Sequence, residues 1–121
     1  MVTILLRLLH VVLGILWVGG AFLVAFFLFP AIRASGPGGG VVMREIAGVR
    51  KMPVFLAIIA WITVLSGIAL YMRNSMGSNG WPGSRSGITF AIGGILAIIA
   101  VLVGTFWNRP VAEKMVAVGA Q

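Results

Sequence analysis

Cysteine is absent from this sequence, and acidic side chains are nearly so. Without cysteine the chain has no disulfide, no thiolate metal site and no thiol nucleophile. The two carboxylates, Glu45 and Glu113, lie outside the apolar runs, whereas proton relays and cation transporters place acidic residues inside the membrane. No nucleotide-binding glycine pattern and no serine at a recognisable spacing from a base is present. We therefore expect no catalytic residues.

What the sequence has is apolar side chains and a small excess of basic ones. Of the 121 residues 60% are hydrophobic and 9% charged, the mean hydropathy is +1.13 and the net charge is +7. A soluble domain of ordinary composition is far less apolar. Because the basic residues sit at the ends of apolar runs, we predict lipid headgroups, and no nucleic acid, as their counter-charge.

Three runs without Asp, Glu, Lys or Arg predict three membrane-spanning helices. The uncharged run from Leu8 to Phe29 reaches roughly 33 Å as a helix, enough to cross a bilayer, and in lipid such a run must be helical. The predicted spans are residues 3–29, which Pro30 closes, residues 52–73 and residues 87–108. The fold class predicted is all-α, with residues 1–121 forming one multi-pass membrane domain.

Two connections join the predicted spans. Residues 30–51 form a loop in which the run Ser35-Gly36-Pro37-Gly38-Gly39-Gly40 is expected to break any helix. After the break, an i, i+4, i+7 apolar pattern predicts either a short interfacial helix or an extension of the second span. Residues 74–86 form an outer loop that is too short and irregular to be a domain.

The basic residues near the span ends predict the orientation. One side carries more of them: Arg33, Arg44, Arg50, Lys51, Arg109 and Lys114. The other side carries Arg7, Arg73 and Arg85. We therefore expect the first loop and the C-terminus in the cytoplasm and the N-terminus outside.

Rows of small residues predict where helices pack, because helices in lipid associate through close contact. The third span has such a row at i, i+4, i+7 and i+11, namely Gly93, Ala97, Ala100 and Gly104. The second span has Ala60, Thr63 and Gly67, and the first has Gly14, Ala21 and Ala25. Either these rows pack within the chain, or some of them face partner subunits.

His10 is the one histidine, and it lies inside a predicted span, where an ionisable residue is a functional hypothesis. His10, Gly14 and Trp17 share one helix face, which could form a slot for a planar macrocycle such as haem or chlorophyll, with His10 as axial ligand. The structural alternative is a neutral His10 that hydrogen-bonds Thr63, Ser66 or a main-chain carbonyl of a neighbouring helix.

A second candidate site combines His10 with Met72 and Met76, which are one helical turn apart on the predicted outer side. Thioethers with an imidazole suit Cu(I). The alternative is that both methionines fill apolar space, as methionine commonly does.

The stretch LLRLLHVVLGILWVGGAFLVAFFLFPAI, together with the second span from Pro53 through Leu65-Ser66-Gly67 to Tyr71, carries a family resemblance. Over about residues 4–72 the chain resembles small bacterial inner-membrane proteins of the copper-resistance D-type and membrane protoporphyrinogen oxidase-like superfamily. The resemblance implies that His10 matches the position that ligates haem in the oxidase branch. Relatives commonly have four or more spans, and the third span here lacks the basic or histidine residue that an oxidase requires.

Three functions remain open from the sequence. The first is a non-catalytic accessory or scaffold subunit, without a cofactor, in a larger membrane complex of electron transport or photosynthesis. The second is a membrane protein that binds haem or another tetrapyrrole through His10. The third is a copper-handling membrane protein.

Overall fold

The computed structural model describes residues 1–108, and every regular element in that part of the chain is helical. This confirms the predicted all-α class. The elements are α1 (Val2–Leu23), η1 (Val24–Leu28), α2 (Phe29–Ala34), α3 (Pro37–Met43), η2 (Arg44–Val49), α4 (Met52–Gly77), η3 (Trp81–Gly83), α5 (Arg85–Val103) and η4 (Gly104–Asn108). Three rods, Val2–Ala34, Met52–Gly77 and Arg85–Phe106, are long and apolar enough to span a membrane.

The first rod does not end at Pro30, so that prediction was wrong. Helix α1 continues through the π-turn η1 into α2, and the rod runs for 33 residues to Ala34. Pro30 sits in the first turn of α2, directly after the π-turn. A proline inside a helix lacks an N–H and clashes with the preceding turn. A wider turn at that point lets the chain remain helical, as π-turns inside α-helices do.

The chain reverses at Gly36, which has a φ of 60°, a conformation open to glycine and strained for other residues. Pro37 then begins α3, so the prediction of a break was right at Ser35–Gly36 and wrong for residues 37–40. The predicted short helix after the break is present as α3 and η2. Lys51, with a φ of 53°, separates η2 from α4.

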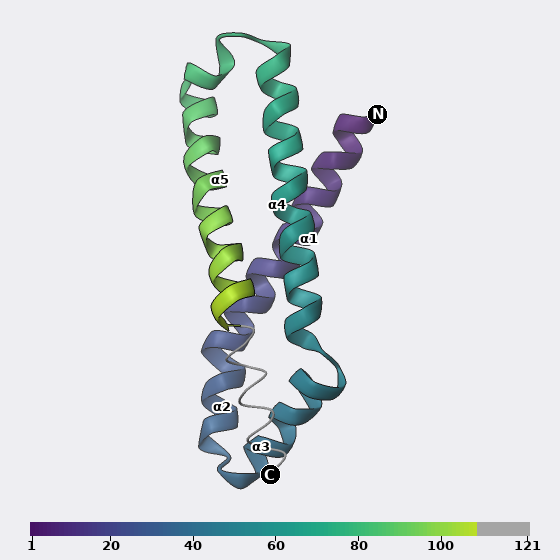
Figure 1. Cartoon of the computed structure of the whole chain (residues 1–121), viewed down its shortest axis with the longest axis vertical. Coiled ribbons are helices and arrows are strands. Elements are labelled where there is room, and N and C mark those ends of the chain that lie inside the picture. The colour runs from purple at the N-terminus through teal and green to yellow at the C-terminus, as the bar shows by residue number, and fades with distance from the viewer. Residues whose placement is uncertain (109–121) are drawn as a thin grey trace.

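The close approach of α2 and α3 depends on Gly39. A Cβ atom there would collide with the main-chain oxygen of Ile32, and Gly39 is buried. Residues 30–51 therefore form a tight helical hairpin and not an open loop, and it lies at one end of the molecule (Figure 1).

Helix α4 is the centre of the fold. In Figure 1, α5 runs antiparallel beside α4, and α1 crosses α4 at an angle. Both α1 and α5 pack on α4. Helix α4 extends four residues beyond the predicted end at 73. Helix α5 begins at Arg85, two residues early, after Ser84 caps it by accepting a hydrogen bond from the Gly87 N–H at 3.1 Å.

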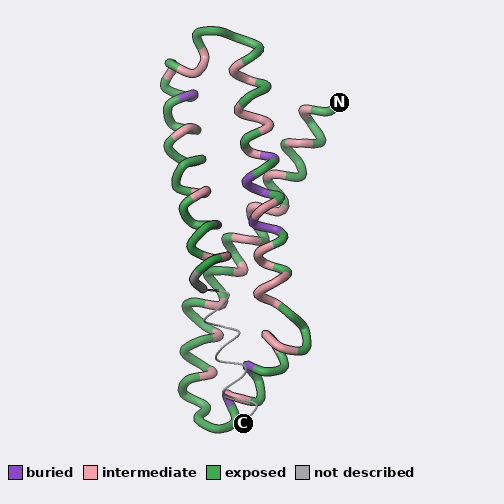
Figure 2. The backbone as a smooth tube through the Cα atoms, viewed as in Figure 1, coloured by how far each residue is buried: buried purple, intermediate pink, exposed green. Residues whose placement is uncertain are grey.

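The core is small. It consists of Ala60, Val64 and Val101, with partly buried Trp17, Trp61, Ala97 and Ile98 packed against it. Figure 2 shows the buried positions gathered mainly on α4, while most of the tube is exposed. No residue of α1 is buried, although its mean composition is strongly apolar. Such extensive exposure of large apolar side chains is what lipid-facing helices present.

The orientation in the membrane stays a prediction. The structure places the ends of α4, at Lys51 and Ser78, at opposite ends of one rod. Arg109 and Lys114, which contribute to the charge asymmetry, lie outside the described residues, as do Pro110 and Glu113.

Candidate functional site

The contact between α1 and α4 is organised around His10. Its Nδ1 lies 2.8 Å from the main-chain oxygen of Thr63 and 3.2 Å from Oγ of Ser66. Ser66 Oγ also donates to the Thr63 oxygen at 2.9 Å. Thr63 and Ser66 are each 5% exposed, so the partners of His10 on α4 are buried. The structural alternative from the sequence named these partners, and the structure places them there.

The geometry fixes the tautomer of His10. A carbonyl oxygen only accepts, so Nδ1 must carry the proton and donate to Thr63 O. The Ser66 hydroxyl donates its hydrogen to the same Thr63 carbonyl oxygen, so its oxygen accepts a hydrogen bond from Nδ1–H of His10. In the neutral ring this leaves Nε2 with a free lone pair. Metal-binding histidines are commonly held in this way, with one ring nitrogen donating to a carbonyl and the other free to ligate.

His10 Nε2 makes no hydrogen bond within the described residues. Within residues 1–108, the one buried side-chain N or O atom without a hydrogen bond is Oγ of Ser75. His10 as a whole is half-buried, and Nε2 lies 3.6 Å from the position of a Cβ atom built on Gly67.

Gly67 makes room for the imidazole ring. A Cβ atom at Gly67 would lie 2.7 Å from Cε1 of His10, closer than side chains approach one another. The missing side chain therefore lets the ring lie against α4 within reach of Thr63 O. Gly67 is therefore explained by the packing of the His10 ring against α4.

Gly14 and Trp17 share the face of α1 that carries His10, as predicted, and α4 covers that face. A Cβ at Gly14 would meet Cγ2 of Thr63 at an ordinary 3.5 Å. Trp17 packs against the core cluster of α4 and α5. The face that the sequence suggested as a slot for a macrocycle is therefore occupied by α4 at Gly14 and Trp17.

Met72 and Met76, the other proposed copper ligands, lie farther along α4 than the part of that helix that contacts His10. The contacts of His10 end at Gly67, and Met72 follows five residues later, about 7.5 Å of helix rise. The side chains of Met72 and Met76 are 56% and 78% exposed. No group of three His, Asp or Glu side chains that could hold a metal occurs among residues 1–108. The copper site stays a prediction.

The small residues of α4 and α5 differ in what they contact. In α4, Thr63 and Gly67 face α1, and Ala60 joins the core with Val101 of α5. In the row on α5, Ala97 packs against that core. A Cβ at Gly93 or at Gly104 would meet nothing within 4 Å in the described residues. Within the described residues, Gly93 and Gly104 of the α5 row are therefore left uncovered.

Two polar contacts between helices escaped the sequence reasoning. The indole N–H of Trp61 donates to Oγ1 of Thr105 at 2.9 Å and ties α4 to η4, which continues α5. Nε of Arg73 donates to Oγ1 of Thr3 at 3.0 Å and ties α4 to the start of α1. Because α1 and α4 were both predicted to span the membrane, polar residues near their ends were the available signal for the second pair.

Comparisons with known proteins find no family model that matches the chain, and no curated protein or solved structure with significant similarity. The resemblance of residues 4–72 to the copper-resistance D-type and protoporphyrinogen oxidase-like superfamily therefore stays a prediction.

Proposed function

We propose that this protein is a non-catalytic accessory subunit that packs against other subunits of a membrane complex in electron transport or photosynthesis. The observation that carries the proposal is the uncovered small-residue row on α5. Ala97 of this row packs inside the chain, whereas no atom of the described residues would lie within 4 Å of a Cβ at Gly93 or Gly104.

The open arrangement of the helices supports the same conclusion. Helices α1 and α5 both use α4 as their support, and Figure 1 shows α1 diverging from the α4–α5 pair toward the N-terminus. Three rods packed in this way enclose little space for a substrate. Because lipid tails are as apolar as leucine, a row of glycine and alanine offers another helix close backbone contact that lipid does not match.

The test is the composition of the complex extracted gently from its native membrane. Replacing Gly93 with Leu fills the row on α5 and should release the chain from its partners. Gly94→Leu is the matched control, because Gly94 also has nothing within 4 Å but points about 100° away around the helix. Both variants should keep the thermal stability of the isolated chain.

Two outcomes would overturn the proposal. One is a wild-type chain that elutes as a stable monomer with no polypeptide at a fixed ratio to it. The other is a complex that Gly93→Leu and Gly94→Leu weaken equally, because the small-residue row would then have no particular part in the contact.

A second candidate function is tetrapyrrole binding through Nε2 of His10. The specific observation in its favour is the donation from Nδ1 to Thr63 O, which leaves Nε2 as the ring nitrogen without a hydrogen bond in the described residues. Haem bound there would supply redox or ligand-binding chemistry, while Thr63 and Ser66 would orient the imidazole.

An absorption spectrum of the purified chain supplied with haem tests this second function. A Soret band that shifts on binding and disappears in His10→Asn supports it. Asn keeps a donor near the position of Nδ1 but has no nitrogen at the position of Nε2. A wild-type chain without the band removes the candidate, as does a band that His10→Asn leaves unchanged.

A further inference from the structure

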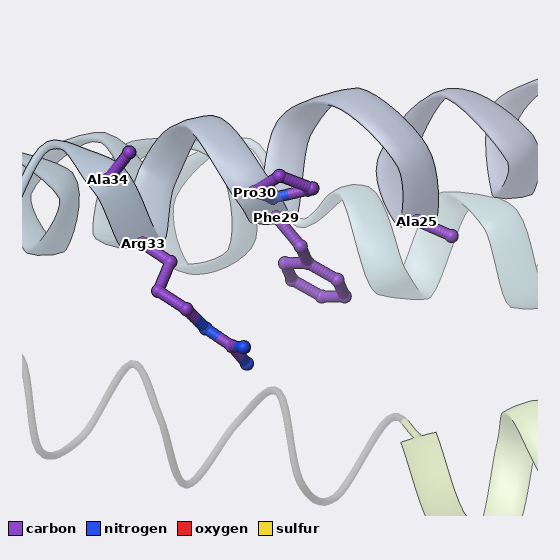
Figure 3. Close-up of a pocket in the computed structure, with 5 residues that line it drawn as sticks. All are labelled: Ala25, Phe29, Pro30, Arg33 and Ala34. Carbon is purple, nitrogen blue, oxygen red and sulfur yellow. The ribbon is translucent and has the colours of Figure 1, made fainter.

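A shallow depression lies on the first rod where η1 joins α2. Within the described residues it is lined by Ala25, Phe29, Pro30, Arg33 and Ala34. Figure 3 shows the side chains of Phe29 and Arg33 extending to the same side of the helix, with the small Ala25 beyond the ring. Ala25, Phe29 and Arg33 follow one another at intervals of four residues, which keeps them on one face.

The depression has a polar end and an apolar end. Arg33 lies in the last turn of α2, at the end of a 33-residue apolar rod. Phe29 and Ala25 lie one and two turns deeper toward the middle of that rod. If the rod spans a bilayer, the guanidinium reaches headgroup depth and the apolar wall lies at the depth of the acyl chains.

Charge near this end of the molecule favours an anion. Arg33, Arg44, Arg50 and Lys51 are all in the α2–α3–η2 hairpin or directly after it. Glu45 is the one carboxylate among the described residues, and it lies 3.1 Å from Nε of Arg50. A guanidinium is permanently charged and matches the oxygens of a phosphodiester.

We propose that this depression binds one anionic phospholipid, with its phosphate on Arg33 and an acyl chain along Phe29 and Ala25. A soluble phosphate would bind the guanidinium of Arg33 and would make no apolar contact with Phe29 or Ala25. A zwitterionic lipid would fit the wall and bring no net negative charge to Arg33. The combination selects a ligand with both parts, which is a lipid with a net negative headgroup.

Native mass spectrometry of the full chain in mild detergent tests the site, with phosphatidylglycerol and phosphatidylcholine of identical acyl chains as competing probes. The wild type should retain one phosphatidylglycerol in preference to phosphatidylcholine. Arg33→Gln should weaken phosphatidylglycerol binding about fivefold, the effect of one basic residue near an anionic headgroup. Arg33→Lys should restore most of the preference, and Phe29→Ala should weaken both lipids.

Arg7→Gln is the matched control, because Arg7 is at the other end of the same rod. It should leave the retained lipid unchanged, and circular dichroism should confirm equal helix content in all variants. Equal retention of the two lipids by the wild type overturns the proposal. So does an equal loss in Arg44→Gln, which would indicate diffuse attraction to the hairpin. Inorganic phosphate alone giving the same Arg33-dependent thermal stabilisation would assign the site to a free anion and reject the lipid.

Discussion

His10 and Thr63 form a hydrogen bond between α1 and α4, with 2.8 Å between Nδ1 and the main-chain oxygen. The acceptor is main chain, so substitution of the Thr63 side chain does not remove it. The donor is a ring that reaches the carbonyl because Gly67 leaves space. The contact therefore requires the histidine at position 10 and the glycine at position 67, whereas at Thr63 it requires only that the main-chain oxygen be in place.

Replacing His10 with Leu should destabilise the α1–α4 contact by about 1 kcal/mol, because one interhelical hydrogen bond is lost in an apolar setting. His10→Asn should recover part of that loss, because its amide can donate from near the Nδ1 position. Reversible unfolding in mixed micelles measures both. Equal losses for Leu and Asn would show that ring packing, and not the hydrogen bond, stabilises the contact.

Gly67→Ala should destabilise the chain by about 1–3 kcal/mol, since the added methyl group would lie 2.7 Å from Cε1 of His10 and the ring would have to move. The same substitution at Gly94 adds a methyl group to open space and should change the free energy of unfolding little. If Gly67→Ala is as harmless as Gly94→Ala, the close contact with His10 is not present in the membrane.

The α2–α3 hairpin should open in Gly39→Ala, because a methyl group there would collide with the main-chain oxygen of Ile32. Gly38→Ala and Gly40→Ala are the controls, as neither methyl group would meet an atom within 4 Å. Since the chain has no native cysteine, spin labels at Ala34 and Val41 can be introduced directly. Their distance should lengthen only in Gly39→Ala.

A double-mutant cycle should detect the link between α4 and α5. Trp61→Phe and Thr105→Val each remove one partner of the 2.9 Å hydrogen bond, and we expect a coupling energy of about 0.6 kcal/mol. Equilibrium unfolding of the four proteins gives this value. Strictly additive losses would mean that the indole N–H and the hydroxyl do not interact in lipid.

Single cysteines should report the predicted orientation in intact cells. A cysteine at Gly38, in the α2–α3 hairpin, should be protected from an impermeant thiol reagent, and one at Ser78, after α4, should react. Gly38 has no close neighbour, so the substitution itself is expected to be tolerated. The opposite labelling pattern would reverse the orientation and leave the helical fold unaffected.

Much of the helical framework was predictable because lipid and length constrain it strongly. A main chain in hydrocarbon must satisfy its own hydrogen bonds, so the uncharged runs could be assigned as helices. Pro30 shows where this reasoning fails. Proline predicts the end of a regular α-helix, but the π-turn at Val24–Leu28 changes the geometry of the preceding turn, and local sequence carries no clear signal for it.

The candidate site was predictable in its residues and only partly in its arrangement. A lone histidine in an apolar span needs a polar partner, which pointed to Thr63, Ser66 or a carbonyl. The sequence could not select among them, because all lie within about one turn of α4. The rotation of α1 about its axis decides which atom Nδ1 meets, and packing over the whole interface sets that rotation.

The sequence by itself determined three apolar rods, their approximate ends and the isolation of one histidine within them. Composition and run length fix these features, because the transfer of each residue to lipid is a local property. Only the tertiary structure decided that His10 lies against Gly67, that Ile32 lies against Gly39, and that no described residue lies against Gly93. Because glycine has no side chain, its sequence position does not indicate which residue packs against it, and only the arrangement of the helices decides that contact.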